Sequence, residues 1–390
     1  MSRKPSMCLC MIVKDEAGVI ERCLQSVLGL IDCWIICDTG STDGTQELVR
    51  SSLQAIPGDL YQRPWIDFGH NRSELMELGQ GRADYLLLLD ADMTVSYDLA
   101  GLEGLSADSY MVRHADEPEY WIKRLVRGDR RWFYVGVTHE YITTDGPDGV
   151  ENLPAIVVYH HGDGANRSTK FERDLRLLSD ELRREPDNAR TVFYLAQTLG
   201  DLGRLDEAID LYRRRATMGG WPEEVFYSLY QVGVLTNRAG QREQAMIALF
   251  DAWNYRPQRA EPLYELAWMF RDRRNHHAAY LVSERGIHTP IPADTLFLHR
   301  WIYQWGLLFE YSIAGYWVGR PRTALEACDR LLAMSALPEP YRRQTAINRT
   351  HCVGALATGP NERTEAARLS LGFDRSSSSA TAPLRRPHGS

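Results

Sequence analysis

The sequence predicts an α/β domain built on a mixed sheet, followed by an all-α domain of helical repeats. Short apolar runs alternate with amphipathic segments between residues 7 and 90, and a strand-like pattern takes over from residue 109. Helical periodicity dominates from residue 168 onward. We therefore expect a sheet domain over residues 1–165, a helical domain over 166–360 and a disordered Ser- and Arg-rich tail over 361–390.

The first half of the predicted sheet is parallel. Three apolar runs, each bounded by polar residues, are typical of strands buried on both faces: residues 7–13, 33–37 and 85–90. Helices are expected over 19–30, after 45 and over 71–79, with a short strand near 59–63. This alternation of strands and helices predicts parallel strands with right-handed crossovers.

Acidic side chains follow each of the three buried strands. The pairs are Asp15 and Glu16, Asp38 and Asp43, and Asp90 and Asp92. Because parallel strands end on the same edge of a sheet, these carboxylates are expected to gather where open α/β sheets bind ligands. Carboxylate oxygens suit Mg²⁺ or Mn²⁺. The alternatives are a solvated turn for Asp90 and Asp92 and a charge effect at a helix N-terminus for Asp15 and Glu16.

The second half of the predicted sheet is antiparallel. Residues 109–114, 120–126 and 131–135 read as strands joined by turns, and the segment from Gly136 to Glu140 follows them. A further apolar run, 155–159, leads to His160 and His161. The sequence contains neither common form of Gly-rich phosphate loop. A metal on Asp90 and Asp92 is therefore the expected way to hold a nucleotide diphosphate.

Small residues recur at regular intervals in the helical domain. Ala208 and Ala245 are 37 residues apart, and Ala245 and Ala279 are 34 apart. Another small residue lies twelve positions before each of them, at Ala196, Gly233 and Ala267. This is the spacing of tetratricopeptide (TPR) helix pairs, in which small residues let the helices approach. A degenerate fourth unit is expected at Gly319 and Ala324, after an inserted Trp-rich segment.

Composition excludes several classes of protein. The 390 residues carry a net charge of −7, which disfavours a dedicated nucleic-acid binder. The seven cysteines include no C-x-x-C pair, so neither a disulfide framework nor a zinc site is indicated, and a reducing cytoplasm is the expected location. The sequence has no apolar stretch of about 18 residues, so no transmembrane helix is predicted. The charged residues after position 13 argue against a signal peptide.

Residues 1–170 resemble the inverting family-2 glycosyltransferases of the GT-A fold. The motifs that carry the resemblance are, in chain order, MIVKDEAGVIERCLQSV, ICDTGSTDGT, WIDFGHNRSE, LLLLDADM, WFYVGVTHEY and VYHHG. With a TPR-like array behind it, the chain resembles in particular the branch of bacterial transferases that glycosylate peptides, such as the glycocin S-glycosyltransferases, and some that build surface saccharides. The resemblance implies a nucleotide-sugar donor, with UDP-glucose or UDP-N-acetylglucosamine as the expected type, and a Mn²⁺ or Mg²⁺ cofactor.

The resemblance also implies roles for individual residues. Those placed at the nucleotide are Asp15, Glu16, Asp38, Ser41, Asp43, Arg72 and Asp90. Arg72 would face the diphosphate or an acidic loop. The metal would take Asp90, Asp92 and His160, with Asp92 as the direct ligand and Asp90 as a ribose or outer contact. His161, beside His160, leaves that assignment open, and a histidine at the edge of the core is the alternative for His160.

Glu140 is the candidate general base that the resemblance implies. Inverting transfer needs a base to take the acceptor proton while a metal stabilises the leaving diphosphate. Partial burial by Trp132, Phe133 and Tyr141 would raise the pKa of Glu140 toward neutrality. The alternative is a structural ion pair of Glu140 with Arg124 or Arg131.

The helical domain has two possible roles. It presents an extended acceptor, a peptide, protein or saccharide, to the catalytic cleft, or it is a rigid extension that stabilises the enzyme or forms a homodimer. Two further functions compete with a glycosyltransferase. One is a TPR-type binding or scaffold protein with an inactive transferase-like domain, and the other is a nucleotidyltransferase, which would release pyrophosphate.

Overall fold

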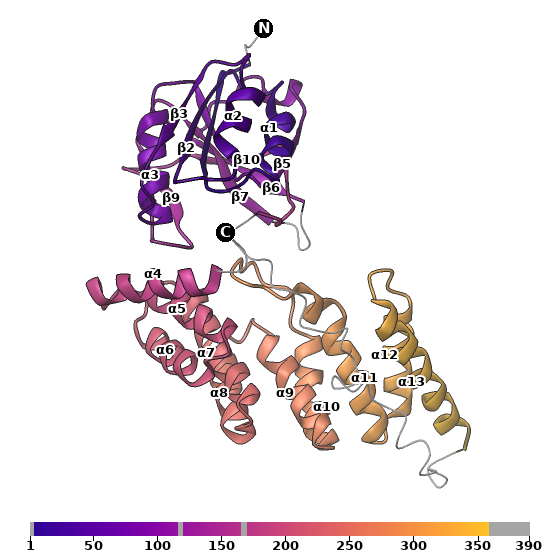
Figure 1. Cartoon of the computed structure of the whole chain (residues 1–390). Helices are drawn as coiled ribbons and strands as arrows, with labels where there is room; N and C mark the ends of the chain where they lie inside the picture. The colour runs from indigo at the N-terminus through magenta and orange to yellow at the C-terminus, as the bar shows by residue number, and fades with distance from the viewer. Residues whose placement is uncertain (1–3, 116–119, 165–169, 359–390) are drawn as a thin grey trace. The chain divides into compact units, whose positions relative to one another are not determined.

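The computed structural model describes residues 4–115, 120–164 and 170–358 (Figure 1). The predicted tail, 361–390, lies outside these residues. The chain divides into two compact units, and the division falls between Pro186 and Asp187. The first unit thus includes helix α4, Lys170–Arg184, and reaches beyond the boundary at residue 165 that we predicted.

The first unit is built on an eight-stranded mixed sheet with the strand order β3-β2-β1-β4-β7-β6-β10-β5. Strands β1, β2, β3 and β4 pair in parallel, as the alternation of strands and helices predicted, whereas β7 pairs antiparallel with both β4 and β6. The strands are β1 Met7–Val13, β2 Cys33–Asp38, β3 Gly58–Gln62, β4 Tyr85–Leu88, β5 Met93–Tyr97, β6 Ser109–His114, β7 Tyr120–Arg127 and β10 Val150–His160.

Helices cover both faces of this sheet, which explains why its central strands are apolar throughout. On β1, Met7 and Leu9 face the core that holds residues of α1 (Ile20–Val27) and α2 (Thr45–Ser52). Cys8, between them, faces the opposite core, which holds residues of α3 (Phe68–Gly79). Successive side chains of a strand point to opposite faces, so a strand covered on both sides carries no polar position.

The sequence analysis misplaced one strand and missed two. Residues 132–135 form β8 (Trp132–Val135), which does not join the main sheet but pairs with β9 (Tyr141–Thr144) in a separate two-stranded sheet. β9 and β5 were not predicted. β5 pairs antiparallel with β10, so that Met93 lies opposite His160. A 3₁₀ turn, η1 (Ala100–Leu102), follows β5.

The second unit consists of paired helices that are TPR-like, as predicted. Its helical segments are α5 Ala189–Asp201, α6 Leu205–Thr217, α7 Pro222–Arg238, α8 Arg242–Tyr255, α9 Glu261–Asp272, α10 His276–Ile287, the π-helical turn η3 Ile302–Gly306, α11 Leu307–Trp317, α12 Pro321–Leu332 and α13 Glu339–Thr358. In the described part of the chain, no helix is both long and apolar enough to span a membrane.

The recurrent small residues lie where paired helices touch. Ala208, Ala245 and Ala324 are fully buried. A side-chain carbon at Gly233 of α7 would lie 2.6 Å from Leu249 Cγ of α8, so only glycine permits this approach. The turn inside each pair uses the left-handed conformation, with Gly203 in the first pair and Arg274, at φ 60°, in the third. The fourth pair, α11 and α12, has Gly319 at φ 82° in this position, as the predicted degenerate unit requires.

Candidate active site

The predicted site residues lie on loops at the carboxyl end of the parallel strands. The loops after β1 and β2 are joined by their own polar side chains. The Asp15 amide donates to Ser41 Oγ at 2.9 Å, and Asp15 Oδ1 accepts from the Thr42 amide at 2.8 Å. Asp43 Oδ2 accepts from the Ala17 amide at 2.8 Å. The structure thus uses Asp15, Ser41 and Asp43, which we had assigned to the nucleotide, to hold two loops together.

Asp38, the last residue of β2, has a carboxylate that is not fully used. Its side chain is buried, and Oδ1 accepts from the amides of Gly40 and Ser41, each at 2.9 Å. Oδ2 is buried and has no hydrogen-bond partner among the described residues. An unsatisfied buried carboxylate oxygen is costly unless a ligand supplies a donor. The geometry therefore supports Asp38 as a ligand-binding residue.

A pocket opens beside Asp38. Its volume is about 320 Å³, at the lower end of the usual range for small-molecule sites. The residues that line it are Asp38, Gly40, Ser41, Gln46, Gln62, Arg63 and Pro64. The sequence analysis missed Gln46, whose Nε2 donates to Asp38 Oδ1 at 3.1 Å, because its position in the first turn of α2 carries no motif.

Asp90 lies in a buried cluster of charges with Arg72, Arg124 and Glu140, here called the edge cluster. Arg72 Nη2 is 2.6 Å from Asp90 Oδ1, and Arg124 Nη1 is 3.4 Å from Asp90 Oδ2. Arg72 Nε is 2.8 Å from Glu140 Oε1. Arg72 thus bridges the two carboxylates, and the side chains of Arg72 and Glu140 are each only 10% exposed.

Charge, rather than burial, decides the protonation of Asp90. Burial alone would raise the pKa of Asp90, but the guanidinium groups of Arg72 and Arg124 outweigh it and hold that pKa well below its usual range. Burial and the nearby charge of Arg124 lower the pKa of His114, which accepts from Arg124 Nε, to about 3. His114 is therefore neutral at physiological pH and Asp90 is ionised.

The structure bears on three expectations in this cluster. Asp90 was predicted to contact metal or ribose, and each of its carboxylate oxygens faces an arginine. Arg72, expected to face the diphosphate or an acidic loop, faces Asp90 in the acidic segment after β4, and also Glu140. Glu140 does form an ion pair, but with Arg72 rather than with Arg124 or Arg131. Sequence could not choose among these partners, because a long arginine reaches several carboxylates and only the fold decides which.

Asp92 and His160 come together as the sequence predicted. His160 Nε2 lies 3.1 Å from Asp92 Oδ2. The pairing of β10 with β5 sets this distance by placing His160 opposite Met93. His161 points to a different group, with its Nε2 2.9 Å from Thr94 Oγ1. The structure thus distinguishes the two adjacent histidines: the His160 side chain lies beside the Asp92 carboxylate, whereas His161 donates its backbone N–H to the Asp92 carbonyl at 3.0 Å.

Glu16 borders the same place. A side-chain carbon at Gly164 would lie 3.2 Å from Glu16 Oε2 and 3.5 Å from Asp92 Oδ2. The loop that carries Gly164 is held by Arg22 of α1, whose guanidinium forms two hydrogen bonds to Asp163, at 2.7 and 3.0 Å. Glu16, which was expected at the nucleotide, thus lies near Asp92.

The donor set at Asp92 suits a metal that takes most of its ligands from elsewhere. No group of three or more His, Cys, Asp or Glu side chains that could hold a metal occurs in the part of the chain that the structure describes. One carboxylate and one imidazole remain, and Mg²⁺-type sites often use one or two carboxylates completed by substrate phosphates and water. Asp92 and His160 fit such a site, and Asp90 does not contribute to it.

The loop that carries Glu140 is fixed from two sides. The Phe68 amide of α3 donates to Val137 O at 3.1 Å, and a side-chain carbon at Gly69 would lie 2.2 Å from Gly136 O. On the other side, Thr138 Oγ1 donates to the buried Asp174 of α4 at 3.4 Å. His139 takes a left-handed conformation at φ 52°, which turns the chain just before Glu140. A loop held in this way presents Glu140 in one orientation.

Part of the sheet unit matches a known protein family. The family described as Glycosyl transferase family 2 matches residues 8–105. The SPbeta prophage-derived glycosyltransferase SunS of Bacillus subtilis is 25% identical over 233 residues, which is 55% of this chain and 54% of SunS. The chain therefore spans about half the length of SunS.

Two more similarities reach into the helical unit. A TPR repeat-containing protein of Synechococcus elongatus, Synpcc7942_0270, is 26% identical over 313 residues, 72% of this chain and 74% of that protein. The crystal structure of MamA covers 47% of this chain and 95% of its own, with a TM-score of 0.35 and 17% identity, too low to support an argument. Residues 8–105 of this chain are a glycosyl transferase family 2 domain.

Proposed function

We propose that this protein is an inverting, metal-dependent glycosyltransferase that moves a hexose from a UDP-sugar to a peptide, protein or saccharide acceptor. The observation that carries the proposal is the arrangement on one sheet edge of a family-2 domain. Asp38, the last residue of β2, has a buried carboxylate oxygen without a partner among the described residues, Asp92 pairs with His160, and Glu140 pairs with Arg72. In this scheme, different residues bind the donor, hold the metal and act as the base.

Donor binding would begin at the pocket beside Asp38. An N–H or O–H group of the nucleoside satisfies Asp38 Oδ2, which gains a charge-assisted hydrogen bond. Asp92 and His160 would hold Mn²⁺ or Mg²⁺, which supplies Lewis-acid stabilisation of the leaving diphosphate. Asp90 has a different task in this scheme, since it holds Arg72 and Arg124 in place.

Glu140 would take the proton from the acceptor. Its carboxylate is held in an ion pair with Arg72, so that pair must loosen as the acceptor binds. Arg72 keeps Asp90 as its second partner at 2.6 Å, so Glu140 can turn away without leaving a buried cation alone. The acceptor oxygen or sulfur then attacks the anomeric carbon as its proton passes to Glu140 and the bond to the diphosphate breaks.

The test is turnover of the full chain with a panel of UDP-sugars and Mn²⁺ or Mg²⁺. We expect UDP release with one sugar, and metal-dependent binding of UDP in calorimetry that EDTA abolishes. Asp92→Ala should remove both effects. Asp59 on β3 forms a surface ion pair with Arg82, and Asp59→Ala, which breaks only this pair, is the matched control. Unchanged metal-dependent binding and turnover in Asp92→Ala would refute the metal assignment, and pyrophosphate release would identify a nucleotidyltransferase.

A further inference from the structure

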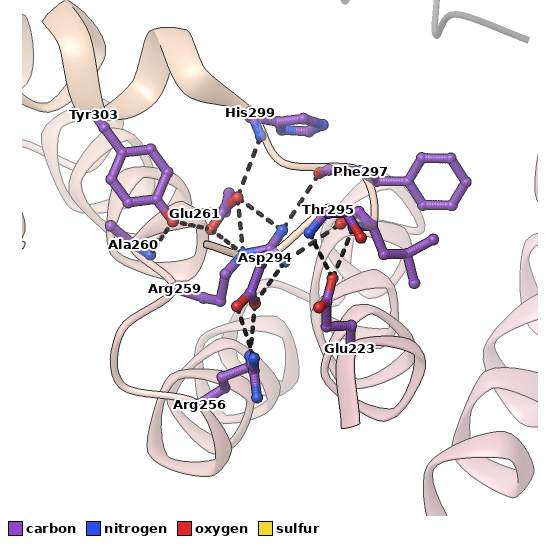
Figure 2. A network of polar contacts seen from close by, with 11 residues as sticks. Glu223, Arg256, Arg259, Ala260, Glu261, Asp294, Thr295, Phe297, His299 and Tyr303 are labelled. Atoms are coloured by element: carbon purple, nitrogen blue, oxygen red, sulfur yellow. Dashed lines mark hydrogen bonds and ion pairs between the residues drawn. The ribbon is translucent and has the colours of Figure 1, made fainter. Parts of the chain in front are cut away.

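A short segment between α10 and η3, residues 294–299, is folded back onto earlier helices of the second unit. We call it the strap. Figure 2 shows it surrounded by charged side chains from the first turns of α7 and α9 and from the connection between α8 and α9. The strap contacts residues as far back in the chain as Glu223 of α7 and Phe193 of α5. It is therefore held by tertiary contacts and not by its own local turns.

The backbone of the strap is bound by side chains, as the backbone of a bound peptide would be. Glu223 Oε2 of α7 accepts from the amides of Thr295 and Leu296, at 2.8 and 2.7 Å. Arg259 donates to the carbonyls of Leu296 and Phe297, each at 3.3 Å. The carboxylate of Glu261 accepts from the amide of His299, at 3.3 Å.

Two side chains of the strap fill dedicated places. The carboxylate of Asp294 receives two hydrogen bonds from Arg256, at 2.6 and 2.7 Å, and one from Arg259 at 3.2 Å. The ring of Phe297, three residues later, lies 4.7 Å from the ring of Tyr227 on α7 and 6.4 Å from that of Phe193 on α5. One place thus accepts an acidic group and the other an aromatic ring.

The receiving side is rigid and almost complete without the strap. Arg259 and Glu261 are both fully buried and bind each other through contacts of 2.8 to 3.1 Å. Tyr303 donates to Glu261 at 2.7 Å and accepts from the Ala260 amide, and Arg259 also lies 4.5 Å from the Phe226 ring. We call Arg256, Arg259, Glu261 and Asp294 the strap cluster; three of its four members belong to the receiving side.

Phe297 pays a conformational cost to be bound. Its φ of 46° is in the left-handed region, which strains the backbone of a non-glycine residue. An external segment that places an aromatic ring in the same position with relaxed backbone would avoid this strain. The strap is therefore a weaker occupant than its contacts alone suggest, and a relaxed competitor is at an advantage.

We infer that the face built by α5, α7 and α9 is a peptide-binding site for an extended protein segment with an acidic residue followed three positions later by an aromatic one, and that the strap is its resident, autoinhibitory ligand. The contacts to Asp294 and Phe297 define this acid-x-x-aromatic chemistry, and Glu223, Arg259 and Glu261 read the backbone between and after them. The inference concerns the helical unit alone and does not depend on the proposed glycosyl transfer.

The test supplies the strap in trans. A fluorescent peptide with the sequence of residues 290–300 is titrated into the full-length protein, and binding is followed by anisotropy. We expect Phe297→Ala, which empties the ring site, to bind the peptide at least tenfold more tightly than the wild type does. Tyr255→Ala, which removes an exposed aromatic ring of α8, is the matched control and should behave like the wild type.

Two further measurements test whether the peptide binds at the site that the strap occupies. Peptides that carry alanine at the position of Asp294 or Phe297 should lose the binding, and adding Glu223→Ala to the Phe297→Ala protein should weaken it. If Phe297→Ala does not fold, Phe297→Gly takes its place, because glycine adopts the same backbone conformation without strain. Equal or absent peptide binding in the wild type and a folded Phe297 variant would overturn the inference, and the strap would then be only a structural connection.

Discussion

The edge cluster and the strap cluster are both buried arginine–carboxylate networks, but only one is complete. In the strap cluster, no buried polar side-chain atom of its four residues lacks a hydrogen bond among the described residues. In the edge cluster, Arg72 Nε approaches Glu140 without hydrogen-bond geometry, and Arg124 Nη2 is buried with no hydrogen-bond partner in the same part of the chain. Outside both clusters, Asp38 Oδ2 also lacks a hydrogen-bond partner among the described residues.

The difference separates charge whose hydrogen bonds are already complete from charge that is open to a ligand. Breaking a complete buried network leaves a charge without a partner and costs folding free energy. An incomplete network keeps groups free for a ligand, and such unsatisfied groups often mark functional sites. We therefore expect substitutions in the edge cluster to change activity more than stability, and substitutions in the strap cluster to do the reverse.

The largest expected effect is that of Glu140→Gln. A general base contributes about 10²–10⁴-fold to a rate, so turnover of the UDP-sugar should fall by that factor while the melting temperature changes little. Steady-state UDP release with a thermal unfolding scan measures both. Glu151→Gln, on the exposed edge of β10, is the control and should keep full rate. A full transferase rate in Glu140→Gln would require another base.

The second effect concerns stability. Glu261→Ala leaves the buried Arg259 without its main partner, which should lower the free energy of unfolding of the helical unit by about 3–5 kcal/mol. Hydrogen exchange resolved by peptide, during urea unfolding, reports this unit separately. Glu207→Ala, which removes only an exposed pair with Arg204, should leave that free energy almost unchanged. If Glu261→Ala lowered the free energy of unfolding no more than Glu207→Ala does, the network would not be structural.

A smaller effect is expected for Asp38→Asn. Asparagine retains an acceptor for the amides of Gly40 and Ser41 but replaces the free Oδ2 with an N–H₂ donor. Loss of one hydrogen bond to a charged group costs about 1.5–3 kcal/mol, so the affinity for UDP should fall roughly tenfold or more without unfolding the protein. Calorimetric titration measures this. Asp32→Asn, at the opposite end of β2, should leave the affinity unchanged.

The smallest effect is a pH dependence in the helical unit. Hydrogen bonds from Arg256 lower the pKa of Asp294 below its usual range, despite the opposing effect of burial. A carboxyl whose folded-state pKa is lowered stabilises the fold above its unfolded pKa of about 3.9, and this contribution is lost as the pH falls through the folded-state pKa. The helical unit should thus lose stability on acidification below about pH 4. Asp294→Asn should flatten this slope, and an unchanged slope would contradict the assignment.

Sequence alone located the edge of the sheet but not the contacts made there. The apolar runs that end at Asp38 and Asp90 fixed where these residues lie, because parallel strands end on one side. The meeting of Asp92 with His160 followed from motif order. The bridge from Arg72 to Asp90 and Glu140 did not, because it depends on the side chain that a folded loop brings within reach.

The same limit applies to the helical unit. The recurring alanines and glycines predicted paired helices, since the backbones can approach only at small residues. The strap was expected only as an inserted segment, because Glu223 and Thr295 are 72 positions apart and no periodic pattern connects them. Local patterns reveal repeats, whereas a contact between distant repeats leaves no periodic trace.

The strap also changes how the repeats should fold. Repeat arrays usually unfold by stages, because each repeat contacts only its neighbours. Here Phe297 touches α5 and α7, while Asp294 is held by the connection between α8 and α9. The strap can make these contacts only when all of these helices are in place. Once formed, it couples the stability of the helices. An array with such a link gains cooperativity, so α5 to α10 should unfold in a single step rather than peel from one end.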